Sequence, residues 1–159
     1  MRKRGFEVVD LMYRKNNGDI KLPQRADYRS CGYDWYAPYD FIIKPNQQKL
    51  IFTDVKSYML DDEMLMLNVR SSQGKIRIQL ANTQGWIDSS YYNNPDNSGN
   101  IALFIRNEGS EDYIVKEGDR IMQSMFVKYL ITDDDSPIFS ERLGGLGSSN
   151  RWAKIEQLK

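Results

Sequence analysis

Short runs of β-branched and aromatic residues, separated by turn-forming residues, constrain the fold of this chain most strongly. Its 159 residues contain no window longer than about ten residues with convincing helical periodicity. The expected strands are Asp40–Lys44, Lys49–Tyr58, Glu63–Val69, Lys75–Asn82, Asn100–Asn107, Asp112–Val115 and Arg120–Leu130, the last being ambiguous between strand and helix. Closely spaced strands without intervening helices predict a single all-β sandwich or barrel.

The hydrophobic pattern also predicts which faces of these strands are buried. Met64–Leu67 and Ile101–Ile105 are apolar at every position, which indicates burial on both faces. Between Ile76 and Leu80, apolar and polar residues alternate, as in a strand with one solvated face.

The composition excludes several functional classes. Lys and Arg together number 22, as do Asp and Glu, so no net charge attracts nucleic acid or an acidic membrane. The chain has no histidine, which excludes Ser-His or Cys-His catalysis and a histidine-built zinc site. A single cysteine, Cys31, excludes an intrachain disulfide and is typical of a reducing cytoplasm. No apolar run approaches the roughly 18 residues of a membrane span.

A glycine- and serine-rich segment, Arg142–Asn150, follows the last expected strand. Its unobstructed backbone N–H groups, hydroxyls and one fixed positive charge can wrap a polyphosphate. It is not a Walker motif, because no lysine follows the glycines and no strand precedes them. The alternative is a flexible terminus. We expect a β domain over residues 1–141 and an arm over 142–159.

Two further segments combine residues that could act together. Arg70, Ser71 and Ser72 place a guanidinium beside two hydroxyls at a strand end, where they could bind phosphate oxygens. Asp88 follows an apolar pair and could act as a base toward water, with the Tyr91 ring available for stacking. The alternatives are a surface arginine with turn serines, and a turn aspartate with a core tyrosine.

Four other residues carry weaker signals. Asp34 could be a turn residue, Gln123 an exposed strand residue, and Asp119 with Arg120 a surface ion pair of little energetic value.

The order of these segments gives the strongest indication of function. Residues 31–37 (CGYDWYA), 69–72 (VRSS), 82–91 (NTQGWIDSSY), 117–123 (EGDRIMQ) and 142–149 (RLGGLGSS) resemble, in the same order, the five motifs of the trimeric dUTPase family. The resemblance covers about residues 22 to 149. The loop at 91–97 (YYNNPDN) looks like an insertion carried by a bacterial and phage subgroup.

The resemblance implies an antiparallel jelly roll that assembles into a homotrimer with an active site at each subunit interface. It also implies hydrolysis of dUTP to dUMP and pyrophosphate by water attack at the α-phosphorus, with Mg²⁺ neutralising charge on the phosphates. Nucleic acid and membranes are not expected as partners.

The same resemblance assigns roles to residues. Asp88 is the catalytic carboxylate. Asp34 and Gln123 act on the metal through water, and Asp119 and Arg120 are structural. The substrate is bound by Arg70, Ser71, Ser72, Asn82, Gly85, Ile87, Tyr91, Gln123, Arg142, Gly144, Gly145, Leu146, Gly147 and Ser148. The backbone of a hairpin from Asn82 to Ile87 reads uracil, and Tyr91 excludes a ribose 2′-hydroxyl.

Three departures from the family pattern accompany the resemblance. Ser72 stands where most members have glycine, and the turn between Arg70 and Asp88 is about one residue shorter than is typical of the family. Leu146 replaces the aromatic residue that stacks over uracil, and Asn150 replaces the last glycine. Trp152 could supply the missing ring.

Two alternatives remain open from the sequence. A dCTP deaminase shares this fold but uses a glutamate base and lacks such a glycine-rich arm. A phage-type regulatory protein could bind a repressor through the Tyr91–Gly99 loop, although a solvated connection between strands is the simpler interpretation.

Overall fold

The computed structural model describes residues 2–137 and 144, and nearly all regular structure there is β-strand. The strands are β1 (Gly5–Val8), β2 (Gln24–Arg25), β3 (Tyr33–Tyr36), β4 (Phe41–Ile43), β5 (Gln48–Phe52), β6 (Val55–Tyr58), β7 (Glu63–Asn68), β8 (Ile78–Leu80), β9 (Gly85–Asp88), β10 (Ala102–Asn107), β11 (Tyr113–Val115) and β12 (Arg120–Lys128). The helical elements in this part of the chain are α1 (Ser71–Lys75) and the 3₁₀ turns η1 (Leu11–Tyr13) and η2 (Ser89–Tyr91). The all-β prediction is confirmed.

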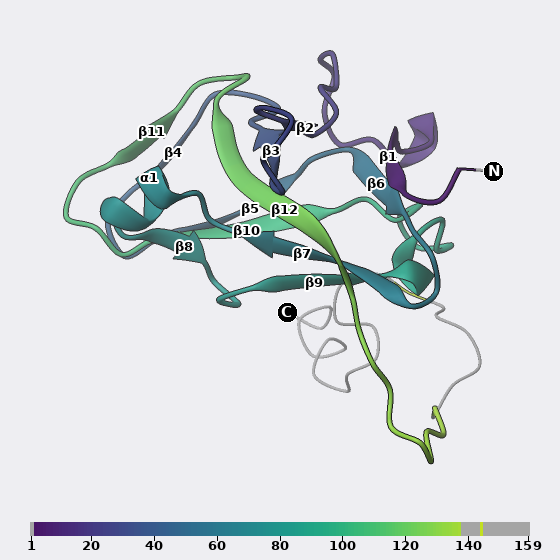
Figure 1. Ribbon diagram of the computed structural model, residues 1–159. Helices are drawn as coiled ribbons and strands as arrows, with labels where there is room; N and C mark the ends of the chain where they lie inside the picture. Colours follow the sequence, from purple (N-terminus) through teal and green to yellow (C-terminus); the bar gives the residue numbers. More distant parts are fainter. Residues whose placement is uncertain (1, 138–143, 145–159) are drawn as a thin grey trace, which may run out of the picture.

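Two antiparallel sheets form the body of the molecule (Figure 1). The larger has the strand order β2-β3-β12-β7-β9, and the smaller has the order β5-β10-β8. Two-stranded ladders, β1-β6 and β11-β4, lie at the ends of this arrangement. The long strand β12 crosses the middle of the larger sheet and settles the ambiguity of Arg120–Leu130 in favour of strand.

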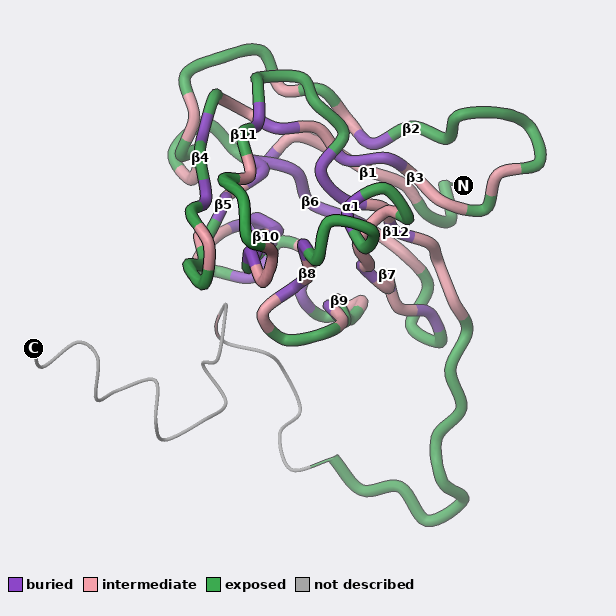
Figure 2. The backbone as a smooth tube through the Cα atoms, turned by 90° about the vertical axis from the view of Figure 1, so that its left-hand side faces the viewer, coloured by how far each residue is buried: buried purple, intermediate pink, exposed green. Residues whose placement is uncertain are grey.

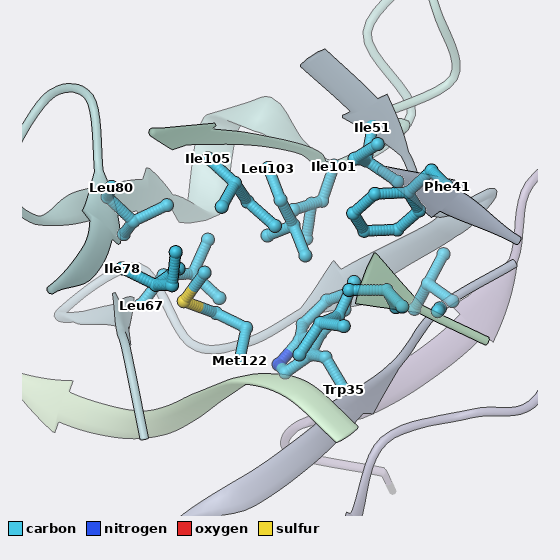
Figure 3. Packing of buried hydrophobic residues seen from close by; sticks show 14 of the residues in the cluster. Trp35, Phe41, Ile51, Leu67, Ile78, Leu80, Ile101, Leu103, Ile105 and Met122 are labelled. Carbon is cyan, nitrogen blue, oxygen red and sulfur yellow. The ribbon is translucent and has the colours of Figure 1, made fainter. Parts of the chain in front are cut away.

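The core lies between the two sheets. Figure 3 shows Leu103 and Ile105 of β10 facing Met122 of β12 and Trp35 of β3. All four side chains are at most 1% exposed, and the Trp35 indole N–H donates a 2.8 Å hydrogen bond to Ser124 Oγ. Burial is concentrated in the central strands, whereas the connections are largely exposed (Figure 2). In the described part of the chain, no helix is long and apolar enough to cross a membrane.

The segment Lys49–Tyr58, expected as one strand, is two strands. Asp54 interrupts it with a φ of 55°, so β5 and β6 belong to different sheets. The carboxylate of Asp54 is fully buried and accepts hydrogen bonds from the backbone N–H groups of Lys15 and Asn16 and from Asn100 Nδ2. These hydrogen bonds offset the cost of the left-handed backbone at Asp54. They come from residues distant in sequence, so the local apolar run did not predict them.

The expected strand Lys75–Asn82 is also wrong over much of its length. Lys75 ends α1, Arg77 has a φ of 60°, and only Ile78–Leu80 pairs with β10. Ile76 is consequently 53% exposed, whereas Ile78 and Leu80 are buried. The alternation of apolar and polar residues across 76–80 therefore predicted a longer strand than the one that forms.

Burial of both faces was predicted for two strands and is not observed within one chain. Buried and half-buried residues alternate along β7, and Phe104 in β10 is 38% exposed beside its cross-strand partner Leu50. Each sheet packs one face on the core, while its outward apolar residues remain accessible in the isolated chain.

The Tyr91–Gly99 loop packs against the N-terminal segment of the chain. Tyr92 donates from its hydroxyl to Glu7 Oε2 at 2.6 Å, and Tyr13 donates to the Pro95 carbonyl at 3.1 Å. The buried Lys56 ammonium donates to Asn93 Oδ1 at 2.7 Å and to Ser98 Oγ at 3.3 Å. The loop is therefore held against the rest of the fold by hydrogen bonds.

Candidate active site

The outward face of the larger sheet carries three of the predicted site residues, Asp34, Gln123 and Asp88. Successive side chains of a strand point to opposite faces, so register alone shows which residues share this face. Gln123 of β12 lies opposite both Asp34 of β3 and Asn68 of β7, and Asp88 of β9 lies opposite Met64. The inward neighbours Trp35 and Met122 fill the core. Asp34, Gln123 and Asp88 therefore lie on one face.

At one end of this face, Asp34 joins two arginines. It is 7% exposed, and its Oδ1 accepts a 2.8 Å hydrogen bond from Arg70 Nε while Oδ2 accepts a 3.2 Å bond from Arg120 Nη1. Charge-assisted hydrogen bonds of this kind are stronger than neutral ones and fix the guanidinium planes. The surface pair expected between Asp119 and Arg120 is replaced by a pair between Arg120 and Asp34. Asp119 instead accepts from the backbone N–H of Lys116 at 2.8 Å.

Arg70, Ser71 and Ser72 begin a short helix where an open turn was expected. Arg70 precedes α1, and Ser71 and Ser72 are exposed in its first turn. The Gln73 side chain accepts from the backbone N–H of Arg70 at 2.8 Å, which satisfies one of the donors left unpaired at a helix start. Gln123 lies next to this turn and donates from Nε2 to the Val69 carbonyl at 3.1 Å.

Asp88 lies at the other end of the same face. It is exposed, and it shares the face with Met64 and with Trp86, whose side chain is 66% exposed. The Trp86 indole N–H donates a 2.7 Å hydrogen bond to Gln84 Oε1, so the ring is tethered. Asp88 therefore shares its face of the sheet with the apolar side chains of Met64 and Trp86.

The expected hairpin from Asn82 to Ile87 is a connection between sheets. β8 pairs with β10, whereas β9 pairs with β7, so the two strands form no common ladder. Thr83 has a φ of 64°, and Gln84 donates from Nε2 to Asn68 Oδ1 at 3.0 Å. Gly85 is buried, and a Cβ there would approach the Leu67 side chain to 3.0 Å. β9 is the last strand of its sheet, so alternate backbone groups along it point away from β7.

Tyr91 lies in the core cluster and is only 5% exposed. Its hydroxyl donates to the Asn100 carbonyl at 3.1 Å and accepts from Asn97 Nδ2 at 2.8 Å. Of the two interpretations left open by the sequence, the core tyrosine describes its position in the isolated chain. Any contact with a sugar is restricted to a small exposed part of the side chain.

The two ends of the face are far apart within one chain. Asp34 lies three strands across and four residues along from Asp88, which corresponds to roughly 20 Å at the usual strand spacing and rise. A pronounced hollow on the described surface is lined instead by Asn16, Lys21, Tyr36 and Glu117, and no predicted site residue lines it. The arginine cluster and Asp88 cannot contact the same phosphate group in a single subunit.

No cluster of three or more metal-ligating side chains occurs within residues 2–137 and 144. Of the predicted arm residues, Gly144 is described and half-buried, whereas Arg142, Gly145, Leu146, Gly147 and Ser148 lie outside the described residues.

Comparison with known proteins decides the family. The family model for dUTPase matches residues 18–149, most of the chain. The chain belongs to the dUTPase family. It is 38% identical over 151 residues to the deoxyuridine 5′-triphosphate nucleotidohydrolase of Lactococcus lactis, covering 94% of this chain and 99% of that protein. It is 32% identical over 125 residues to the Clostridium novyi protein of the same name, covering 78% and 83%.

Solved structures of dUTPases have the same fold. The dUTPase of Streptococcus mutans superposes with a TM-score of 0.71 at 32% identity, covering 81% of this chain and 98% of that chain. The dUTPase from phage phi11 of Staphylococcus aureus, in which a species-specific insert was visualised, gives 0.66 at 17% identity, covering 88% and 99%. At that identity the phage dUTPase supports the fold alone.

The positions of two residues near the predicted site, Gln73 and Trp86, were not predicted from the sequence. Gln73 was not singled out because an arginine, not serine or threonine, occupies the helix N-cap, which hides the usual capping pattern. Trp86 was considered only as an apolar neighbour of Asp88, although its exposure places it on the same face as the carboxylate.

Proposed function

We propose that the protein is a dUTP pyrophosphatase that releases dUMP and pyrophosphate by water attack at the α-phosphorus. The observation that carries this proposal is the family match over residues 18–149 together with 38% identity to a dUTP nucleotidohydrolase across 94% of the chain. Asp34, Gln123 and Asp88 lie on one face of one sheet, and Arg70–Ser72 lie at the start of α1 beside it, which is consistent with a common site.

Asp88 is proposed to hold and deprotonate the attacking water. It shares its face with Met64 and Trp86, so covering this face would exclude bulk water from around the attacking water. The same carboxylate could also accept a bond from the deoxyribose 3′-hydroxyl.

Arg70, Ser71 and Ser72 are proposed to bind the phosphates. Asp34 accepts a hydrogen bond from Arg70 Nε, which leaves the two terminal guanidinium nitrogens to bind phosphate oxygens. A guanidinium fixed in this way loses less entropy when it binds an anion. The exposed hydroxyls of Ser71 and Ser72 lie directly after it.

Mg²⁺ fits this site as a hydrated ion carried on the substrate phosphates, where it would neutralise charge developing on them. Both Asp34 oxygens already accept from arginines, but a carboxylate can accept about four hydrogen bonds. Asp34 and the side-chain oxygen of Gln123 could therefore still accept hydrogen bonds from metal-bound water.

A shared site explains the separation of roughly 20 Å between Asp88 and the arginine cluster. In a cyclic trimer, the Asp88 end of one subunit can face the Arg70 end of the next. The outward apolar residues Met64, Met66 and Met125 on this face supply surface for such a contact. We therefore propose that the enzyme is a homotrimer.

Base and sugar recognition are assigned to the segment around β9. The outward backbone groups between Asn82 and Ile87 could pair with the edge of uracil, and cytosine would leave some of these groups unpaired. Tyr91 would limit space for a 2′-hydroxyl through its small accessible surface. The arm, with Arg142, Gly144, Gly145, Leu146, Gly147 and Ser148, would close over the phosphates as a separate unit at residues 142–159.

The competing functions have less support. The relatives reported above are named nucleotidohydrolases, and Asp88 stands where a deaminase would use glutamate. The phage structures are too distant to argue for a repressor partner. We also propose that the protein belongs to the subgroup with the 91–97 insertion and that it is cytoplasmic.

A nucleotide panel tests the function. The purified protein with Mg²⁺ should release pyrophosphate from dUTP and act poorly on dCTP, dTTP and UTP. Ammonia release from dCTP, or no turnover of dUTP, would overturn the proposal.

A further inference from the structure

We propose that Gln73 is the positioning residue of the phosphate-binding turn, and that it sets how tightly the enzyme holds the triphosphate. This inference rests on the proposed assignment of Arg70–Ser72 to the substrate phosphates. Gln73 need not touch the substrate, because it acts through the backbone of Arg70.

The Gln73 side chain connects three elements through one buried amide. It is 3% exposed. Its Oε1 accepts from the backbone N–H of Arg70 at 2.8 Å, and its Nε2 donates to the Tyr113 hydroxyl at 2.9 Å and to the Ile121 carbonyl at 2.5 Å. The start of α1 is thereby attached to β11 and β12.

These contacts require both a donor and an acceptor at one position. An apolar side chain of similar size would leave the Arg70 N–H and the Ile121 carbonyl without this partner in a dry environment, which is costly. Burial raises the pKa of the Tyr113 hydroxyl, so this group stays protonated, and its oxygen accepts the bond from Gln73. Glutamine satisfies all three neighbours at once.

The attachment falls where the proposed phosphate ligands need it. The Arg70 side chain is fixed by Asp34, and the preceding Val69 carbonyl accepts from Gln123. Gln73 fixes the Arg70 backbone, which leaves the exposed residues Ser71 and Ser72 on a turn anchored at both ends. Loss of this anchor should displace hydroxyls and guanidinium together, and small displacements of substrate-positioning groups are costly to rate.

The experiment compares two buried amides that each make three hydrogen bonds. Asn107 is 1% exposed and bonds only to backbone groups away from the site: it donates to the Ile43 and Glu111 carbonyls and accepts from the Gly109 N–H. Gln73→Met and Asn107→Leu should therefore lower the thermal unfolding temperature comparably. Only Gln73→Met should lower kcat/KM for dUTP, by on the order of 10-fold or more.

Binding measurements separate positioning from general damage. Gln73→Met should weaken binding of a non-hydrolysable dUTP analogue with Mg²⁺ much more than binding of dUMP, whereas Asn107→Leu should leave the ratio of the two affinities unchanged. Tyr113→Phe, which removes one acceptor of the Gln73 amide, should change the ratio in the same direction but less, and it serves if Gln73→Met does not fold.

Unchanged affinity ratios in soluble Gln73 and Tyr113 variants would overturn the inference. That outcome is distinct from failure of the proposed function, because the wild-type protein would then still hydrolyse dUTP. A wild-type protein without dUTP turnover would remove the proposed function itself, and the inference with it.

Discussion

Two carboxylates on one face of the sheet differ in their surroundings. Asp34 is 7% exposed and paired with Arg70 and Arg120, whereas Asp88 is exposed beside Met64 and Trp86. Both Asp34 oxygens are occupied by hydrogen bonds from the two guanidinium groups. This contrast supports Asp88 as the base and Asp34 as the residue that orients the arginines.

Asp88→Asn should lower kcat by a factor on the order of 10² or more while leaving nucleotide affinity largely intact, because the amide keeps the shape and loses the basic oxygen. Steady-state pyrophosphate release and binding of a non-hydrolysable dUTP analogue measure the two effects. Turnover close to the wild-type rate would exclude Asp88 as the base.

At the scale of elements, the Tyr91–Gly99 loop depends on a buried cation. Lys56 is 5% exposed and holds Asn93 and Ser98, while Ser98 donates to Asp10 at 2.7 Å. The hydrogen bond from Ser98 and the Lys56 ammonium, which lies 3.5 Å from the Asp10 carboxylate, lower the pKa of Asp10. The loop begins at Tyr91, the last residue of η2, and Asp88 immediately precedes η2. Contacts that hold the loop therefore also hold the chain next to Asp88.

Lys56→Met should lower the free energy of unfolding by about 1–3 kcal/mol, because the loop amide and hydroxyl lose their buried partner. Denaturant unfolding of this variant is compared with Lys128→Met, whose exposed pair with Asp62 should contribute much less. Equal stability of the two variants would show that Lys56 does not hold the loop.

At the scale of the whole molecule, the site is divided between the two ends of one sheet. Asp88 and Arg70 lie at opposite ends of β7, which neither residue can cross. Assembly is therefore a requirement of catalysis in the proposed mechanism.

Mixed trimers test this requirement. Asp88→Asn and Arg70→Ala should each be nearly inactive alone, but trimers containing both contain one site with both native residues. Refolding a 1:1 mixture should restore about a quarter of wild-type activity if subunits mix statistically in a cyclic trimer. Each variant refolded alone is the control, and a mixture as inactive as its components would place the whole site within one subunit.

The sequence by itself determined the fold class, most strand positions and the family. Strands such as β7 and β12 follow from local β-branched and apolar runs, and the motif order is independent of packing. Four strands, β1, β2, β3 and β9, were not among those expected, and two of the expected strands were misread. Asp54 splits one strand through bonds to Lys15, Asn16 and Asn100, and Lys75 closes a helix that the alternation concealed.

The tertiary structure decided which of these residues meet. Strand pairing joins segments distant in sequence, and register fixes the face on which each side chain lies. For this reason the ion pairs of Asp34 with Arg70 and Arg120, 36 and 86 residues away, were not predictable from local patterns. The same strand pairing places Asp88 far from Arg70. The burial of Tyr91 likewise depends on tertiary packing. A local sequence pattern carries no information about such non-local distances, so neither result was predictable from it.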